Sequence, residues 1–218
     1  MSVRVLIADD QALFREAIAA LLARDPRLEI TASVDSGDAA IEFVRAHTVD
    51  VVLMDIRMPG TDGIAATREV LRLRPQARVL VLTTFDLDEY VYAAVREGAS
   101  GFLTKDATPE ALADAVVAVG AGEAVMSPSA TRALLGFVRE GAPETDSTDA
   151  LAVLSPREQE IARVLATGAS NDDIARRLFL SENTVKTHVK AVLAKLGLPD
   201  RIHVVIWAYE HGILRPRA

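Results

Sequence analysis

The chain has 218 residues, half of them hydrophobic, which suffices for one large or two modest folded domains and excludes bulk disorder. It has no cysteine, which excludes disulfides and thiolate metal sites, and no apolar run near the roughly 18 residues of a membrane span. We therefore expect a cytoplasmic protein without a signal peptide or a membrane partner. Residues 1–150 carry a net charge of −10 and residues 151–218 a net charge of +3, so the second part is the one expected to face a polyanion.

The first 120 residues alternate between two kinds of pattern. Apolar, β-branched runs predict five strands, over residues 3–8, 28–34, 51–54, 78–83 and 101–105. Helical spacing of apolar residues predicts five helices, through residues 14–22, 36–45, 62–74, 87–96 and 108–119. This alternation predicts an α/β fold with a doubly wound, five-stranded parallel sheet.

The remaining chain is different in pattern. A helix is expected over residues 127–139, and the polar, turn-rich residues 140–149 read as a linker. Four helices then follow in an all-α pattern, three of them with expected N-caps at Ser155, Asn171 and Ser181, and the last over residues 201–211. The expected domains are residues 1–122, a linker with a helix over 123–150, and residues 151–218.

Carboxylates end two of the predicted strands, Asp9 and Asp10 the first and Asp55 the third. In a sheet of order 2-1-3-4-5 these two strands are neighbours, so the three carboxylates meet at one rim. A Mg²⁺ ion would remove their repulsion, and Asp55 would then be a nucleophile toward phosphorus. Thr83 and Lys105 end the fourth and fifth strands, where a hydroxyl and an ammonium suit phosphoryl oxygens.

Plainer interpretations exist for each of these residues. A strand-end Asp is more often a helix cap than a nucleophile, and a Lys after a strand is usually solvated. Their joint placement favours the phosphoryl site. An aspartate-nucleophile phosphatase is the enzymatic alternative, but it would want a second Asp where this chain has Arg57, so we expect a phosphoacceptor rather than an enzyme.

Four stretches resemble the receiver domain of two-component response regulators, which has a flavodoxin-like fold: Asp9–Asp10, Leu53–Gly63, Leu82–Phe85 and Gly98–Asp106. The resemblance implies phosphorylation of Asp55 by a sensor histidine kinase. It implies Mg²⁺ held by Asp10, Asp55 and the backbone carbonyl of Arg57, with Asp9 acting largely through water. It also implies that Thr83 and Phe102 form a switch pair, although Phe102 taken alone reads equally well as a core aromatic.

The two predicted helices Asn171–Phe179 and Ser181–Leu196, separated by Leu180, are typical of a helix-turn-helix. Base contacts are expected from Lys186, Thr187 and Lys190, and phosphate contacts from Ser181, Thr184 and His188. From periodicity alone, a solvated charged helix face is an equal alternative. His203 and His211 on the last helix are expected at the surface or in an interface.

The basic part resembles the LuxR-type DNA-binding domain in the stretches Leu154–Glu158, Asn171–Ala175, Ser181–Val189 and Lys195–Gly197. With the receiver-like part before it, the chain resembles a NarL/FixJ-type transcriptional regulator. The resemblance implies sequence-specific DNA binding by a homodimer that forms on phosphorylation. A DNA-binding protein that works without phosphorylation is the remaining alternative.

Overall fold

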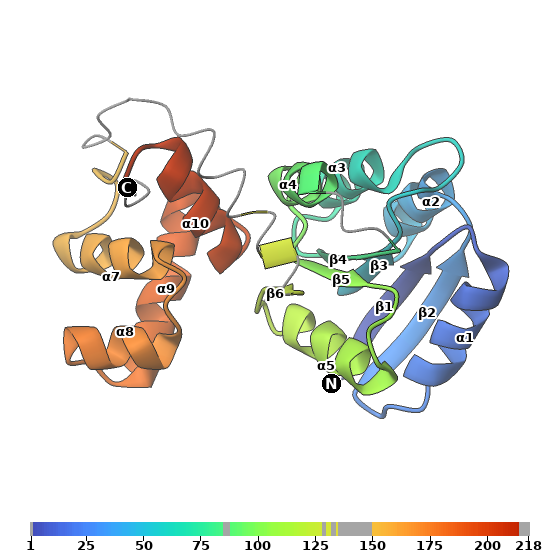
Figure 1. Cartoon of the computed structure of the whole chain (residues 1–218), viewed down its shortest axis with the longest axis horizontal. Coiled ribbons are helices and arrows are strands. Elements are labelled where there is room, and N and C mark those ends of the chain that lie inside the picture. Colours follow the sequence, from blue (N-terminus) through green and yellow to red (C-terminus); the bar gives the residue numbers. More distant parts are fainter. Residues whose placement is uncertain (1, 85–87, 128–129, 132–133, 135–149, 214–218) are drawn as a thin grey trace. The chain divides into compact units, whose positions relative to one another are not determined.

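The computed structural model describes residues 2–84, 88–127, 130–131, 134 and 150–213. The chain forms two compact units, Met1–Leu134 and Leu135–Ala218, each with its own hydrophobic core (Figure 1). Among the residues that the structure describes, no helix combines the length and the apolar character needed to cross a membrane.

The first unit is built on a parallel sheet whose order is β2-β1-β3-β4-β5-β6. Strand β3 and the apolar middle of β4 are buried on both faces, as expected where helices cover both sides of a sheet. The strands are β1 (Val3–Ala8), β2 (Leu28–Val34), β3 (Val51–Met54), β4 (Arg78–Thr83), β5 (Gly101–Thr104) and β6 (Val125–Met126).

The sequence predicted five strands in the order 2-1-3-4-5, and the structure adds a sixth. The two residues of β6 pair with β5, Val125 beside Gly101 and Met126 beside Phe102. Gly101 permits this approach, because a side chain there would place its Cβ 2.8 Å from the carbonyl oxygen of Val125. A strand of two residues is too short to leave a periodic pattern, which is why it was read as part of the linker.

Helices cover both faces of the sheet (Figure 1). Helices α1 and α5 pack against one face, together with Val5, Ile7 and Leu53 of the sheet. The other face carries the remaining three helices, which follow one another in space. The helices are α1 (Ala12–Leu22), α2 (Gly37–Ala46), α3 (Gly63–Leu73), α4 (Asp88–Arg96) and α5 (Pro109–Gly120), which confirms the predicted doubly wound α/β fold.

Three sequence predictions fall wholly or partly on residues that the structure does not describe. Most of the helix expected over residues 127–139, and all of the linker over 140–149, lie outside the described residues. Leu87, the expected start of the fourth helix, also lies outside them. The domain boundaries at residues 122 and 150 therefore stay a prediction.

The second unit is helical, as predicted. Its helices are α7 (Pro156–Ala166), α8 (Asn171–Leu178), α9 (Glu182–Leu196) and α10 (Arg201–Glu210). Ser155 and Ser181 cap α7 and α9 as expected, each accepting a hydrogen bond from the backbone N–H three residues on. The cap expected at Asn171 was wrong: Ser170 caps α8 in a capping box with Asp173, and Asn171 is the first helical residue.

His203 was expected at the surface or in an interface, but it packs inside the second unit itself. Its side chain is buried, and its Nδ1 lies 2.9 Å from Oδ1 of Asp200, the N-cap of α10. Asp200 is completely buried and also accepts hydrogen bonds from the backbone N–H groups of Ile202 and His203. The sequence did contain a signal for this contact, an Asp followed three residues later by a His at a helix start. The third residue of a helix lies close to its N-cap, so the two side chains can form a hydrogen bond.

Phe179, between α8 and α9, combines an exposed ring with an unfavourable backbone. It has φ 55° and ψ 47°, the left-handed region, and its side chain is 95 % exposed. The left-handed conformation costs an L residue about 1–2 kcal/mol but does not strain glycine. Phe179→Gly is therefore expected to raise the free energy of unfolding, measured by urea titration, by about 1 kcal/mol. Phe179→Ala is the control, because it removes the ring and keeps the strain; an equal gain from alanine would contradict the explanation.

Glu158 joins α7 to α9. Its Oε2 accepts a hydrogen bond from Nζ of Lys195 at 2.7 Å and another from the backbone N–H of Ser155 at 2.7 Å. The bond from Lys195 is the main reason why the pKa of Glu158 falls from 4.5 to about 2. A carboxyl whose pKa is lowered by folding stabilises the folded state above its unfolded pKa, and this stabilisation is lost as pH falls toward the folded value.

Glu158→Gln is therefore expected to lower the thermal midpoint of the second unit near neutral pH. The difference from the wild type should shrink as pH falls from about 4.5 toward about 2. Thermal unfolding at a series of pH values checks this. The control is Glu160→Gln. This exposed carboxylate forms an ion pair with Arg157 on the same helix and does not join two helices. A pH-independent difference would show that packing, and not the charge of Glu158, is responsible.

Candidate functional site

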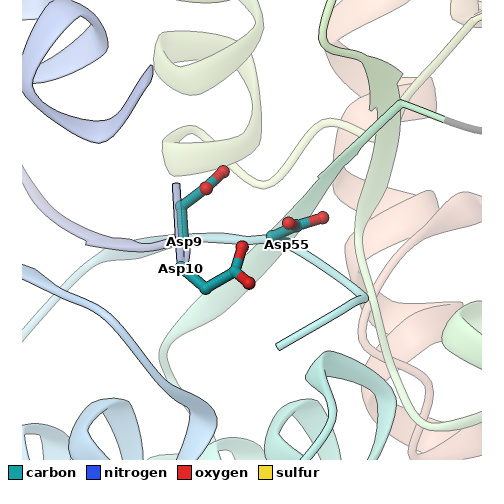
Figure 2. Close-up of side chains that lie close together, drawn as sticks. All are labelled: Asp9, Asp10 and Asp55. Carbon is teal, nitrogen blue, oxygen red and sulfur yellow. The ribbon is translucent and has the colours of Figure 1, made fainter. Parts of the chain in front are cut away.

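The strand ends of β1 and β3 bring the three carboxylates together. Ala8 pairs with Met54 across these strands, and the backbone N–H of Asp55 donates to the carbonyl of Ala8 at 2.9 Å. Carboxylate oxygens of Asp9, Asp10 and Asp55 all lie within 4.8 Å of one another. Figure 2 shows the three side chains converging from the two neighbouring strand ends. This is the crowding at one rim that the sequence predicted.

Lys105, just after β5, bridges two of these carboxylates. Its Nζ lies 2.6 Å from Oδ2 of Asp9 and 2.9 Å from Oδ2 of Asp55, and its side chain is only 6 % exposed. The other oxygens of the two carboxylates accept backbone hydrogen bonds, Oδ1 of Asp9 from Gln11 and Oδ1 of Asp55 from Ile56. Backbone and ammonium together hold Asp55 in one orientation at the rim.

The surroundings of Asp55 act on its ionisation in opposite directions. Burial raises the pKa of Asp55, because the charged form loses hydration. The hydrogen bond and the charge of Lys105 work against this rise, whereas the neighbouring charge of Asp9 adds to it. The net direction is upward, so a further positive charge at this rim would favour the ionised carboxylate that a nucleophile needs.

The residues at this rim fit a Mg²⁺ ion. The group formed by Asp9, Asp10, Asp55 and Lys105 contains three carboxylates and one ammonium. Its excess of negative charge is left for a cation to balance. Carboxylate oxygens are the hard ligands that Mg²⁺ prefers, and the exposed Asp10 leaves one side of the group open to the water molecules that this ion retains.

Arg57 lies on the rim of a depression of about 400 Å³ that begins beside Asp10. Its guanidinium stacks over the ring of Tyr90 on α4, at 5.7 Å from the ring centre. Tyr90 was not singled out from the sequence. No short-range pattern connects it to Arg57, because the two residues come from different elements.

The two residues expected to form a switch lie on neighbouring strands. Thr83 ends β4 and is buried, and Phe102 lies on β5, where it pairs with Val81. The ring of Phe102 is fully buried. That Thr83 and Phe102 move together as a switch pair stays a prediction.

The candidate nucleic-acid face lies on α9. Lys186, Thr187 and Lys190 are exposed on it, as expected, while Val185 and Val192 of the same helix are buried in the core of the second unit. Lys186 pairs with Glu182 one turn earlier, with 2.8 Å between Nζ and Oε1. A single helix thus presents both lysines to solvent while its opposite face is fixed by packing.

The residues expected to contact phosphate lie at the start of the same helix. Ser181 is exposed; its hydroxyl accepts the N–H of Thr184 and lies 2.8 Å from the hydroxyl of Thr184. His188 is half-buried. The start of α9 therefore presents the hydroxyls of Ser181 and Thr184 side by side, with the acidic Glu182 in the same turn.

Two family models match the chain. The response regulator receiver domain matches residues 5–117, and the luxR family of bacterial regulatory proteins matches residues 152–208.

Similar proteins match along nearly the whole chain. The probable transcriptional regulatory protein NarL of Mycobacterium tuberculosis is 37 % identical over 97 % of this chain and 96 % of its own. The DNA-binding transcriptional activator DevR/DosR of the same organism is 36 % identical over 98 % and 97 %. Among solved structures, the response regulator ChrA of a heme-sensing two-component system has 36 % identity and a TM-score of 0.53, over 98 % of this chain and 99 % of its own.

Proposed function

The chain belongs to the transcriptional response regulators that join a receiver domain to a LuxR-type DNA-binding domain, and from this premise we propose that Asp55 is its phosphoacceptor. The observation that carries the proposal is the position of Asp55: a buried carboxylate at a strand end, beside two further carboxylates and held by Lys105. The ion pair of Arg4, near the start of β1, with Asp50, just before β3, lies at the opposite end of these two strands.

We propose that one oxygen of Asp55 attacks the phosphorus of a phosphohistidine on a sensor histidine kinase. A bond forms between this oxygen and phosphorus while the bond from phosphorus to the histidine nitrogen breaks, and the nitrogen keeps the electron pair. Asp9, Asp10, Asp55 and the backbone carbonyl of Arg57 would hold Mg²⁺, which supplies positive charge for the phosphoryl oxygens. Lys105 moves its ammonium to the new phosphoryl group, and Thr83 donates its hydroxyl to it.

The result of phosphorylation is proposed to be a homodimer that binds two DNA half-sites. A single small module buries too little surface for tight specific binding, and a dimer doubles that surface. The LuxR-type domain and the name of the relative DevR/DosR support DNA as the partner. Because the proposed partner is DNA, we place the protein in the cytoplasm. We also propose that it accepts a phosphoryl group without turning over a substrate as an enzyme.

The phosphoacceptor is tested by mass spectrometry after incubation with Mg²⁺ and a small acyl phosphate. The wild type is expected to gain one phosphoryl group, and Asp55→Asn none. Asp35→Asn is the matched control, because Asp35 also follows a strand of the same sheet, β2, but is exposed and apart from the carboxylate group. Uptake by Asp55→Asn would refute the assignment.

DNA control is tested by selecting fragments of the source genome with the same proteins. Enrichment of fragments that share an inverted repeat, only with phosphorylated wild type, is the expected result. Equal enrichment with Asp55→Asn would leave DNA binding in place and remove phosphorylation as its control. Hydrolysis of a generic phosphoester in the same preparation would point to an enzyme instead.

Lys190→Ala is expected to weaken binding to the selected fragment roughly tenfold, because a lysine at a base edge discriminates by about 1–3 kcal/mol. Fluorescence anisotropy at fixed salt measures this. Arg163→Ala is the control: it removes an exposed cation of α7, outside the proposed face, and should change affinity little. Equal losses in both variants would indicate a general charge effect.

A further inference from the structure

The ammonium of Lys105 has a third neighbour besides its two carboxylates. Its Nζ lies 4.7 Å from the centre of the Phe14 ring. This is within the distance at which a cation is attracted by the negative face of an aromatic ring. Because the Lys105 side chain is only 6 % exposed, little water competes for the ammonium, and the attraction is stronger than on an open surface.

Phe14 is held in place from two directions. It lies in the first turns of α1, half-buried, and packs against the apolar cluster between the sheet and helices α1 and α5. The next residue, Arg15, donates a hydrogen bond to the backbone carbonyl of Asp9. The start of α1 is therefore tied to the strand end that carries the acidic group, and the ring cannot easily turn away from Lys105.

The two kinds of neighbour differ in what a reaction would do to them. The pairs with Asp9 and Asp55 are the ones that Lys105 must give up when its ammonium turns to a new phosphoryl group. The face of Phe14 takes no part in that exchange, since an uncharged ring neither gains nor loses charge. It can keep attracting the ammonium throughout, which prevents the long side chain from swinging out into solvent.

We propose that Phe14 is a positioning residue for phosphoryl transfer, whose ring face keeps the ammonium of Lys105 at the rim of the sheet. The proposal rests on the proposed function of Asp55 and adds a residue to it. Phe14 touches no reacting atom; it acts through Lys105. Loss of the ring face is expected to slow phosphorylation of Asp55 on the order of fivefold to tenfold.

The test changes the charge distribution of the ring and leaves its shape nearly intact. Phe14 is replaced in the full chain by phenylalanines with increasing ring fluorination, which progressively remove the negative potential of the ring face. Rates of phosphorylation by a small acyl phosphate are measured at saturating Mg²⁺, with thermal unfolding of each protein alongside. Phe43 on α2 receives the same series as a control, because its ring is also half-buried but stacks on His47, the C-cap of that helix.

The expected result is a rate that falls stepwise with fluorination at position 14, with an unchanged unfolding midpoint and no trend at position 43. Phe14→Leu, which keeps apolar bulk, should be about as slow as the fully fluorinated protein. Equal rates across the series at position 14, or the same trend at position 43, would overturn the proposal while leaving Asp55 as phosphoacceptor. A wild type that takes up no phosphate would overturn both.

Discussion

Lys105→Met is expected to slow phosphorylation of Asp55 about a hundredfold, the usual cost of removing one charge-stabilising donor from a reacting centre. The same variant should bind Mg²⁺ more tightly, because the ammonium now 2.6 Å from Asp9 and 2.9 Å from Asp55 no longer repels a second cation. Opposite changes in rate and in metal affinity distinguish this explanation from simple misfolding, which would weaken both.

The pH dependence of this variant follows from the same contacts. Burial raises the pKa of Asp55, and Lys105 opposes the rise, so removing Lys105 should raise the pKa further. Attack requires the ionised carboxylate, so the rate of Lys105→Met should begin to fall at a higher pH than that of the wild type as the solution is acidified.

Phosphorylation rates over a pH series and Mg²⁺ titration calorimetry measure both effects. Lys195→Met is the matched control, since Lys195 also pairs with a carboxylate, Glu158, but in the second unit. Wild-type rates in Lys105→Met would refute the role given to this ammonium.

Gly63→Ala is expected to destabilise the first unit by about 3 kcal/mol, although alanine normally favours a helix over glycine by up to about 1 kcal/mol. Gly63 is the first residue of α3, after the N-cap Asp62. A Cβ at this position would lie 1.9 Å from the backbone carbonyl oxygen of Asp55 and 2.9 Å from Cα of Ile56. Backbone cannot move aside as a side chain can, so α3 and the backbone at Asp55 and Ile56 must separate.

Urea unfolding measures the loss of stability, and phosphate uptake should fall with it because Asp55 is displaced. Gly120→Ala is the comparison variant, at a helical glycine whose closest neighbours are side-chain carbons of Val3, at 2.9 Å and 3.0 Å. Its cost should be clearly smaller. A Gly63→Ala protein as stable as the wild type would show that α3 does not press against Asp55.

Local patterns predicted much of this protein. The strand ends that carry Asp9, Asp55 and Thr83 were placed from apolar runs, and the caps Ser155 and Ser181 from their positions before helical patterns. Such features depend on neighbours within a few residues, so they can be read directly from the chain.

Most features that the sequence analysis missed or predicted wrongly depend on contacts between residues far apart in the chain. The strand β6 exists because Gly101 leaves room for it, and His203 is buried because α10 packs its start against the helical core. The contacts of Phe14 with Lys105, of Tyr90 with Arg57 and of Gly63 with Asp55 each join two different elements. No spacing rule connects residues that only the packing of separate elements brings together.

Hydrophobic periodicity and charge, both read along the chain, predict the alternation of strands and helices, the acidic residues at two strand ends and the basic helical part after residue 150. The packing of separate elements, by contrast, places one ammonium between Asp9 and Asp55, sets a ring of α1 against this ammonium, and leaves room only for a glycine where α3 meets Asp55. Distances between side chains on separate elements depend on how these elements pack, and packing is a property of the whole core.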